Sequence, residues 1–98
     1  MRVYRITVGT DNPHFTTRKS EKLVHILLAH GQEHFTMREV IGYYYGRKVT
    51  TFEVDISIDD ADRAQTLAEA IGLAFHQKSV MLTYVGDAQF INLTEVFD

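Results

Sequence analysis

Two stretches in which apolar and polar residues alternate constrain the fold of this chain more than any other feature. Residues 3–9 read VYRITVG and residues 51–58 read TFEVDISI. Every second side chain is apolar, starting from Tyr4 in the first stretch and from Phe52 in the second. A period of two is typical of a β-strand with one buried and one solvated face. The two stretches therefore predict a half-covered sheet whose core side carries Tyr4, Ile6, Val8, Phe52, Val54, Ile56 and Ile58.

Two amphipathic segments predict the helices that cover this sheet. The first helix starts at one of the capping residues Thr16, Thr17 or Ser20 and runs to about His30, after which Gly31 closes it. The second lies within residues 59–77, DDADRAQTLAEAIGLAFHQ, where apolar residues recur at helical spacing. Its three leading aspartates complement the positive end of the helix dipole.

The remaining segments predict further strands. Thr36 and Glu39 imitate a helix capping box, but twelve of the nineteen residues 40–58 are β-branched or aromatic, and we predict two strands joined by a loop at residues 46–48. A strand at residues 80–84 follows the second helix. Gly86 and Asp87 then form either a turn or a bulge before a short extra strand from Ala88 to Leu93. The order predicts an α+β, ferredoxin-like βαββαβ sandwich in a single domain, residues 1–98, with both helices on one face.

Several functional classes are disfavoured by composition and motifs. The absence of cysteine excludes disulfides, thiolate metal sites and cysteine nucleophiles. The five histidines show no four-residue spacing within a helix, so no metal site is predicted. No P-loop, dinucleotide fingerprint or nucleophile elbow occurs, and no cofactor is expected. The N-terminus lacks the apolar run of a signal peptide or membrane span, which predicts a cytoplasmic protein without membrane contact.

The net charge of −3 is unevenly distributed along the chain. Residues 1–49 carry eight Lys or Arg against four acids, a balance of +4, whereas residues 50–98 carry two against nine, a balance of −7. This acidic total disfavours a surface that follows a phosphate backbone. An RNA-recognition sheet also presents aromatic side chains on its central strands, whereas the strands here expose Arg5, Thr7, Thr51, Glu53 and Asp55. We therefore do not expect a nucleic-acid partner.

The segment FHQKSV, which supplies Phe75, Gln77, Ser79 and Val80, leads straight from the second helix into a strand. Together with Phe35–Thr36 and the Gly42–Gly46 hairpin it resembles a loose group of small uncharacterised bacterial and bacteriophage proteins with the ferredoxin-like fold. The resemblance covers roughly residues 35–91 and implies the same fold. It carries no activity and no functional residue across. Physically, Phe75 fills the core and Gln77 satisfies carbonyls at the helix end.

The residues at the start of the first helix suggest an anion site, and the alternative is that their charges are simply solvated. Arg18, Lys19 and Lys22 lie at the start of the first helix, where cations oppose the helix dipole but an anionic ligand is attracted. Such a local conflict can indicate a ligand. We predict that the hairpin tip of the same or a neighbouring subunit closes this site with Tyr44, Arg47 and Lys48, and that Arg5 adds a further cation.

These expectations lead to a function of the binding class. We expect a non-catalytic, oligomeric module, by default a homodimer paired through its last strand, that captures an anionic small ligand such as a nucleotide, or a partner protein. In a phage setting, which only the resemblance implies, such a module would sequester a host defence signal or block a host defence protein. The alternative is a small cofactor-free enzyme with a cleft between sheet and subunit. Glu53 and Asp55 are its acid–base candidates, although pairing with Arg5 favours a surface ion-pair ladder instead.

Overall fold

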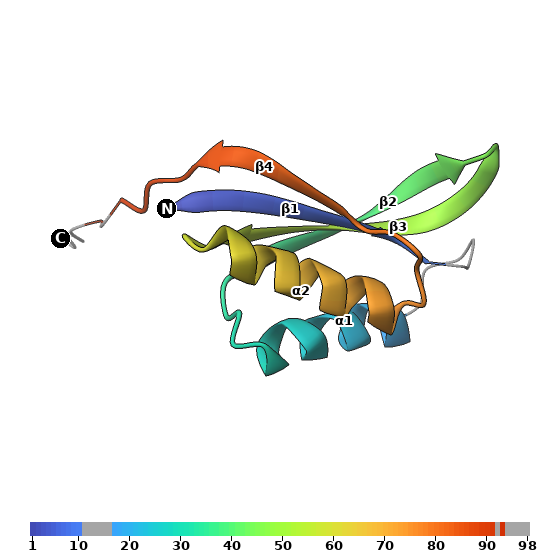
Figure 1. Cartoon of the computed structure of the whole chain (residues 1–98), viewed down its shortest axis with the longest axis horizontal. Coiled ribbons are helices and arrows are strands. Elements are labelled where there is room, and N and C mark those ends of the chain that lie inside the picture. The colour runs from blue at the N-terminus through green and yellow to red at the C-terminus, as the bar shows by residue number, and fades with distance from the viewer. Residues whose placement is uncertain (11–16, 92, 94–98) are drawn as a thin grey trace, which may run out of the picture.

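The computed structural model describes residues 1–10, 17–91 and 93. Four strands form one antiparallel sheet in the order β2-β3-β1-β4, and both helices lie on the same face of it (Figure 1). This is the ferredoxin-like α+β topology that the sequence predicts. The elements are β1 (Arg2–Gly9), α1 (Thr17–Ala29), β2 (Phe35–Tyr44), β3 (Arg47–Ser57), α2 (Ala61–Ala74) and β4 (Met81–Asp87). Neither helix is long and apolar enough to cross a membrane.

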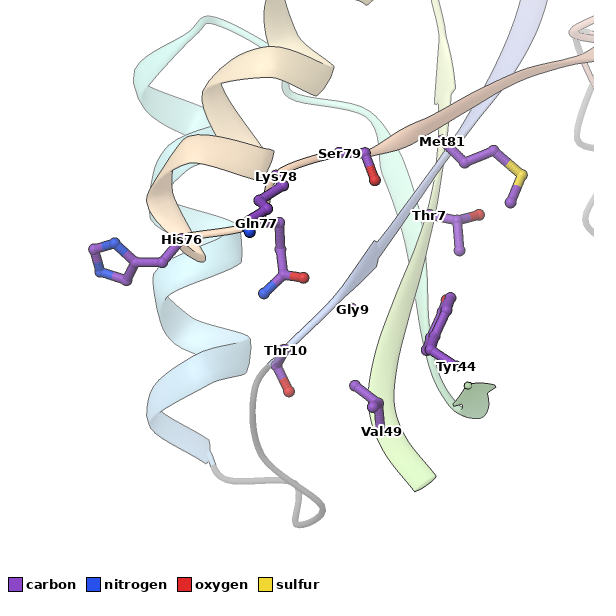
Figure 2. Close-up of a pocket in the computed structure, with 10 residues that line it drawn as sticks. All are labelled: Thr7, Gly9, Thr10, Tyr44, Val49, His76, Gln77, Lys78, Ser79 and Met81. Atoms are coloured by element: carbon purple, nitrogen blue, oxygen red, sulfur yellow. The ribbon is translucent and has the colours of Figure 1, made fainter. Parts of the chain in front are cut away.

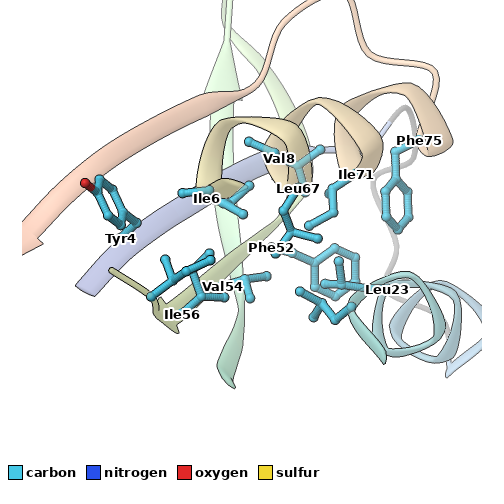
Figure 3. Packing of buried hydrophobic residues seen from close by; sticks show 14 residues of the cluster. Tyr4, Ile6, Val8, Leu23, Phe52, Val54, Ile56, Leu67, Ile71 and Phe75 are labelled. Carbon is cyan, nitrogen blue, oxygen red and sulfur yellow. The ribbon is translucent and has the colours of Figure 1, made fainter. Parts of the chain in front are cut away.

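The core lies between the sheet and the two helices. β1 and β3 are the central strands and pair with each other from Val3↔Ser57 to Gly9↔Thr51, so that their alternating apolar residues reach the same face. All seven inward positions predicted from the two alternating stretches are buried. The rings of Phe52 and Phe75 meet at 5.9 Å between centroids. The helices add Leu23, Leu27, Ala64, Leu67, Ala68, Ile71 and Phe75 to this cluster (Figure 3).

α1 begins and ends close to its predicted bounds. It begins at Thr17, and the competing cap Thr16 lies outside the described residues. Gly31 closes it with φ 75°, and the N–H of Gln32 donates to the C=O of Leu27 at 2.9 Å. This hydrogen bond spans six residues, and together with the left-handed glycine it defines a Schellman motif. The motif satisfies carbonyl groups that the helix leaves unpaired.

α2 is capped at both ends. The Asp60 carboxylate accepts hydrogen bonds from two backbone N–H groups of the first turn. At the other end the N–H of Gln77 donates to the C=O of Gly72 at 2.9 Å, which again is a Schellman bond. The left-handed residue of this motif is His76, with φ 57°. Glycine is the usual residue at this position, so the histidine holds a strained backbone.

The β2–β3 turn begins one residue earlier than predicted and is one residue shorter. Tyr45 and Gly46 form the two-residue turn with φ 52° and 79°, the positive values of a type I′ turn. Arg47 and Lys48 are therefore not loop residues but the first residues of β3, and Arg47 pairs with Tyr44. The sequence misleads here because tyrosine rarely takes the left-handed conformation. The hairpin extends past the ends of both helices, and Tyr45 at its tip is fully exposed (Figure 1).

β4 contains a bulge, and within the described residues no further strand follows it. Val3 pairs with Gly86, but the next residue, Tyr4, pairs with Tyr84, which leaves Val85 unpaired. Gly86–Asp87 is thus part of a bulged strand rather than a turn. The predicted extra strand at Ala88–Leu93 is wrong for its described residues, 88–91 and 93, none of which is in a strand. The N–H of Ala88 still donates to the C=O of Met1 at 2.7 Å.

Candidate functional site

A cavity of about 450 Å³ opens where the sheet meets the loop between α2 and β4. We call it the Tyr44 cavity. Its size is within the range of small-molecule pockets. Sheet residues form one part of its wall, residues 76–79 form another, and the Tyr44 ring closes the side next to the hairpin (Figure 2). The sheet residues are Thr7, Gly9, Thr10, Val49 and Met81.

The cavity exists because β4 starts late relative to the end of β1. Met81, the first residue of β4, pairs with Thr7, so the last residue of β1, Gly9, has no β4 partner. On its other side β1 stays paired with β3 as far as Gly9↔Thr51. The chain that would have continued β4 is instead the loop that leaves the Schellman motif of α2. One edge of β1 therefore opens into the cavity.

The Tyr44 ring is positioned by a glycine on its own strand. A Cβ atom on Gly42 would lie 2.7 Å from both Tyr44 Cε2 and Thr51 Oγ1, closer than real Cβ atoms approach. The ring and the threonine hydroxyl therefore occupy the space above Gly42. This also corrects the expectation that Thr51 is exposed, since it is 1% exposed. Tyr44 itself remains 44% exposed, so its ring is held at the wall yet accessible to a ligand.

The loop wall is fixed to the helix end. The Gln77 side-chain amide donates to the C=O of Phe75 at 3.0 Å, which confirms the predicted role of this residue at the helix terminus. Its Oε1 lies close to the Cβ position of Gly9, across the cavity. Lys78 and Ser79 follow in the loop, whereas the imidazole of His76 points away from the other lining side chains (Figure 2). The loop thus offers amide, hydroxyl and ammonium groups to a ligand.

The charges at the Tyr44 cavity are positive. Lys78 lines it directly. Lys19 approaches from α1, where its Nζ donates to the hydroxyl of Thr10, a lining residue, at 3.3 Å. None of the described residues that line the cavity is Asp or Glu. The arrangement therefore favours an anion over a cation.

The predicted site residues do not all gather at this cavity. Tyr44 lines it and Lys19 reaches it through Thr10. Lys22 instead donates to the C=O of Ala74 and lies 5.2 Å from the centroid of the Phe75 ring, so it links the two helices. Three further cations, at the start of α1 and of β3, are exposed and do not line the cavity: Arg18, Arg47 and Lys48.

Arg5 belongs to an ion-pair network on the open face of the sheet. Its Nε donates to Asp55 Oδ1 at 2.7 Å and its Nη2 to Asp55 Oδ2 at 3.1 Å. Arg38 from β2 lies 3.4 Å from Glu53 and 3.6 Å from Asp55. Hydrogen bonding from Arg5 holds the pKa of the Asp55 carboxyl below its usual range, despite partial burial. A carboxylate that is harder to protonate is a poor general acid, so the predicted ladder describes this face better than catalysis does.

A second hollow, of about 420 Å³, lies at the other end of the open face. Asp55 lines it but is already paired with two arginines. Phe35 and Phe90 add apolar surface to its rim. Among the residues that the structure describes, no group of three or more His, Cys, Asp or Glu side chains could hold a metal ion. The Tyr44 cavity is the better candidate because its polar groups converge on one space.

Sequence reasoning missed most of the loop and floor of this site. It gave Gln77 a structural role only and did not treat Gly9, Lys78 or Ser79 as site residues. Gly9 at the end of an alternating strand was visible as a signal, because a glycine in a strand often marks a close approach. The relative start of β4 was not visible, because register depends on pairing with a distant strand.

Neither a protein-family model nor a curated protein matches this sequence. Among solved structures, a phage SAM lyase in the apo state is 20% identical, with a TM-score of 0.66 over 99% of this chain and 92% of that chain. A DUF3240-family protein from Shewanella baltica is 14% identical, with a TM-score of 0.59 over 95% and 97%. A dimeric ferredoxin-like protein of unknown function from Thermobifida fusca is 13% identical, with a TM-score of 0.43 over 88% and 91%. At these identities the likeness to the first two structures shows a shared fold, which confirms the expected resemblance at that level.

Proposed function

We propose that this protein is a small binding module that captures an anionic, nucleotide-type ligand in the Tyr44 cavity. The observation that carries the proposal is the composition of this one space. An aromatic ring, several hydroxyl and amide groups and a lysine converge on about 450 Å³, and its described lining includes no acid. Ligand sites are commonly built in this way, from a few polar groups placed around an apolar surface.

Each part of a nucleotide has a counterpart among these residues. Aromatic rings stack on bases of any sequence because every base has a π-face. The hydroxyls of Thr7 and Ser79 and the Gln77 amide can bond a sugar or a base edge. Lys78 and Lys19 supply the positive charge that a phosphate needs, in the manner of a point charge.

Sequestration is the role that we propose for this binding. The acid–base candidates of the sequence, Glu53 and Asp55, lie on the open face of the sheet and are engaged by Arg5 and Arg38, which favours binding over acid–base catalysis by these two carboxylates. A phage-encoded module of this kind would lower the concentration of a nucleotide signal in the host, or would block a host defence protein with the same surface. We propose a cytoplasmic homo-oligomer consisting of single-domain subunits.

The alternative is a cofactor-free enzyme that acts on a sulfonium nucleoside. It is favoured by the neighbour described as a phage SAM lyase, which matches almost the whole chain, and by the Tyr44 ring, whose face attracts cations. The positive charge of Lys78 opposes it. A sulfonium nucleoside and a nucleotide share the adenosine group, so one experiment can compare both hypotheses.

Differential scanning fluorimetry with a ligand panel tests the proposal. The panel contains AMP, ADP, cyclic AMP, the corresponding guanine nucleotides, adenosine and S-adenosylmethionine. A ligand at 100 times its Kd adds about 2.7 kcal/mol of stability, which corresponds to a rise in Tm of roughly 10 °C or more for a domain of this size. We expect such a shift with at least one nucleotide and a smaller shift with adenosine.

The same samples, incubated with S-adenosylmethionine and separated by chromatography, test the enzymatic alternative. Unchanged S-adenosylmethionine together with a nucleotide shift supports the binding module. Turnover of S-adenosylmethionine at a rate proportional to protein concentration would contradict the binding module and support the enzymatic alternative. If no compound changes the Tm and none is consumed, the Tyr44 cavity is not a small-molecule site and a protein partner becomes the working hypothesis.

A further inference from the structure

The floor of the Tyr44 cavity is a glycine that the local backbone does not require. Gly9 does not have a left-handed φ, so an L-residue can adopt its conformation. A Cβ atom at this position would lie 3.5 Å from Val49 Cγ1, 3.7 Å from Gln77 Oε1 and 3.8 Å from Tyr44 Cε2. These are ordinary van der Waals distances. Alanine would therefore be accommodated, but its methyl group would stand between the walls of the cavity.

Glycine at this position is a disadvantage for the fold taken alone. A glycine in the interior of a strand costs roughly 0.5–1 kcal/mol relative to alanine, because it loses more conformational freedom on folding, and Gly9 at the end of β1 bears up to this cost. No steric conflict at Gly9 compensates for this cost, in contrast to Gly42, where a Cβ would meet two atoms at 2.7 Å. What Gly9 provides is a bare stretch of main chain on which a flat group can lie.

The backbone N–H and C=O groups of Gly9 also face the cavity. The N–H of Thr10 donates to the C=O of Thr50 in β3 at 2.9 Å. Because the polar groups of successive strand residues point to opposite sides, those of Gly9 point toward the β4 side. β4 begins only at Met81, opposite Thr7. The edge of a planar ligand can take the place that a paired strand would otherwise occupy.

We infer that Gly9 and Lys78 determine which ligand the cavity takes. The planar ring of the ligand lies across the Gly9 main chain beside the Tyr44 ring, and the phosphate lies at the loop wall, next to Lys78. The missing side chain of Gly9 leaves the space that the ring occupies, and the charge of Lys78 makes the cavity prefer a phosphate-bearing ligand over an uncharged nucleoside. This inference rests on the proposed function and specifies its ligand as a planar heterocycle that bears a phosphate.

Isothermal titration calorimetry with AMP and with adenosine as probes tests the two roles separately. In Gly9→Ala the added methyl group should weaken both probes about tenfold, the equivalent of 1.4 kcal/mol, and Gly9→Val should weaken them further. In Lys78→Ala the loss of a charge-assisted bond should weaken AMP about tenfold and leave adenosine within about twofold. Lys48→Ala, which removes an exposed lysine outside the cavity, is the matched control and should change neither affinity.

Thermal unfolding of each variant separates a blocked cavity from a damaged fold. Gly9→Ala should melt at or above the temperature of the unmodified protein, since alanine is the better strand residue. A clearly lower Tm would show that the fold needs this glycine, and would overturn the inference. AMP and adenosine affinities that stay unchanged in both Gly9 variants would overturn it as well, as would equal losses of AMP and adenosine in Lys78→Ala. Absence of binding to the unmodified protein would instead remove the proposed function itself.

Discussion

Replacing His76 with glycine should stabilise the protein, although it deletes a whole side chain. α1 and α2 end in the same Schellman motif, with Gly31 at φ 75° in one and His76 at φ 57° in the other. The left-handed conformation costs a non-glycine residue roughly 1–2 kcal/mol. The additional freedom of glycine in the unfolded chain offsets about 0.4–1 kcal/mol of this. The expected net gain in the free energy of unfolding is therefore about 0.5–1 kcal/mol.

The reverse exchange on the other helix is the matched control. Gly31→Ala introduces the penalty that His76→Gly removes, and it should lower stability by a similar amount. Among the described residues, a Cβ at Gly31 would meet only a terminal nitrogen of Arg63, at 3.4 Å. This nitrogen donates to the C=O of His30 at 3.1 Å but ends a flexible side chain that can shift by a few tenths of an ångström, so the loss should mainly reflect the backbone. His76→Ala keeps the left-handed penalty and should leave stability close to that of the unmodified protein.

Urea denaturation measures all three variants, and thermal melting provides a second scale. A gain of 1 kcal/mol corresponds to about 4–8 °C in Tm for a domain of 60–100 residues. Because the imidazole points away from the Tyr44 cavity, His76→Gly should also leave ligand affinity unchanged (Figure 2). A loss of stability in His76→Gly, or equal stability in His76→Gly and His76→Ala, would refute the strain argument and indicate that the imidazole makes a stabilising contact.

Three further predictions concern the rest of the molecule. Asp60→Ala removes the cap of α2 and should cost about 1 kcal/mol in urea denaturation, whereas an unchanged midpoint would show that the cap is dispensable. Arg5 lowers the pKa of Asp55 in the folded state, so this pair stabilises the fold above the ordinary Asp pKa of 3.8, and the stabilisation is lost as the pH falls through the lowered pKa. Asp55→Asn should therefore flatten the profile of stability against pH between about pH 5 and pH 2. Parallel profiles for the two proteins would contradict the assignment. Size-exclusion chromatography with light scattering should give a mass above the 11.3 kDa of one chain, and a single species at that mass would reject the proposed homo-oligomer.

The sheet and both helices were predictable because their signals are local. Alternation of apolar and polar residues over residues 3–9 and 51–58 determines which side chains face the core. A shift of the strand register by one residue would turn all of these apolar side chains toward solvent. The helix bounds followed from Gly31 and from the aspartates before Ala61. The hairpin turn was misplaced because Tyr45 takes a conformation that Asn or Gly usually supplies.

The site was only partly predictable because it depends on how distant segments meet. A cluster of cations at the start of α1 does not reveal that Lys22 reaches across to the end of α2 while Lys19 points to β1. Likewise, Gly9 and Lys78 are 69 positions apart and become neighbours through the late start of β4. Tyr44 was identified because three successive tyrosines are conspicuous in a chain of this size, but the role of Gly42 in placing its ring needed coordinates.

The hairpin beyond the helices has a consequence for how this protein can diversify. Its outermost residues have water on both sides, so no interior packing restricts which side chains they carry. Substitutions there leave the core untouched as long as the turn at Tyr45–Gly46 still closes. The same scaffold can therefore exchange these outer side chains one at a time without having to refold.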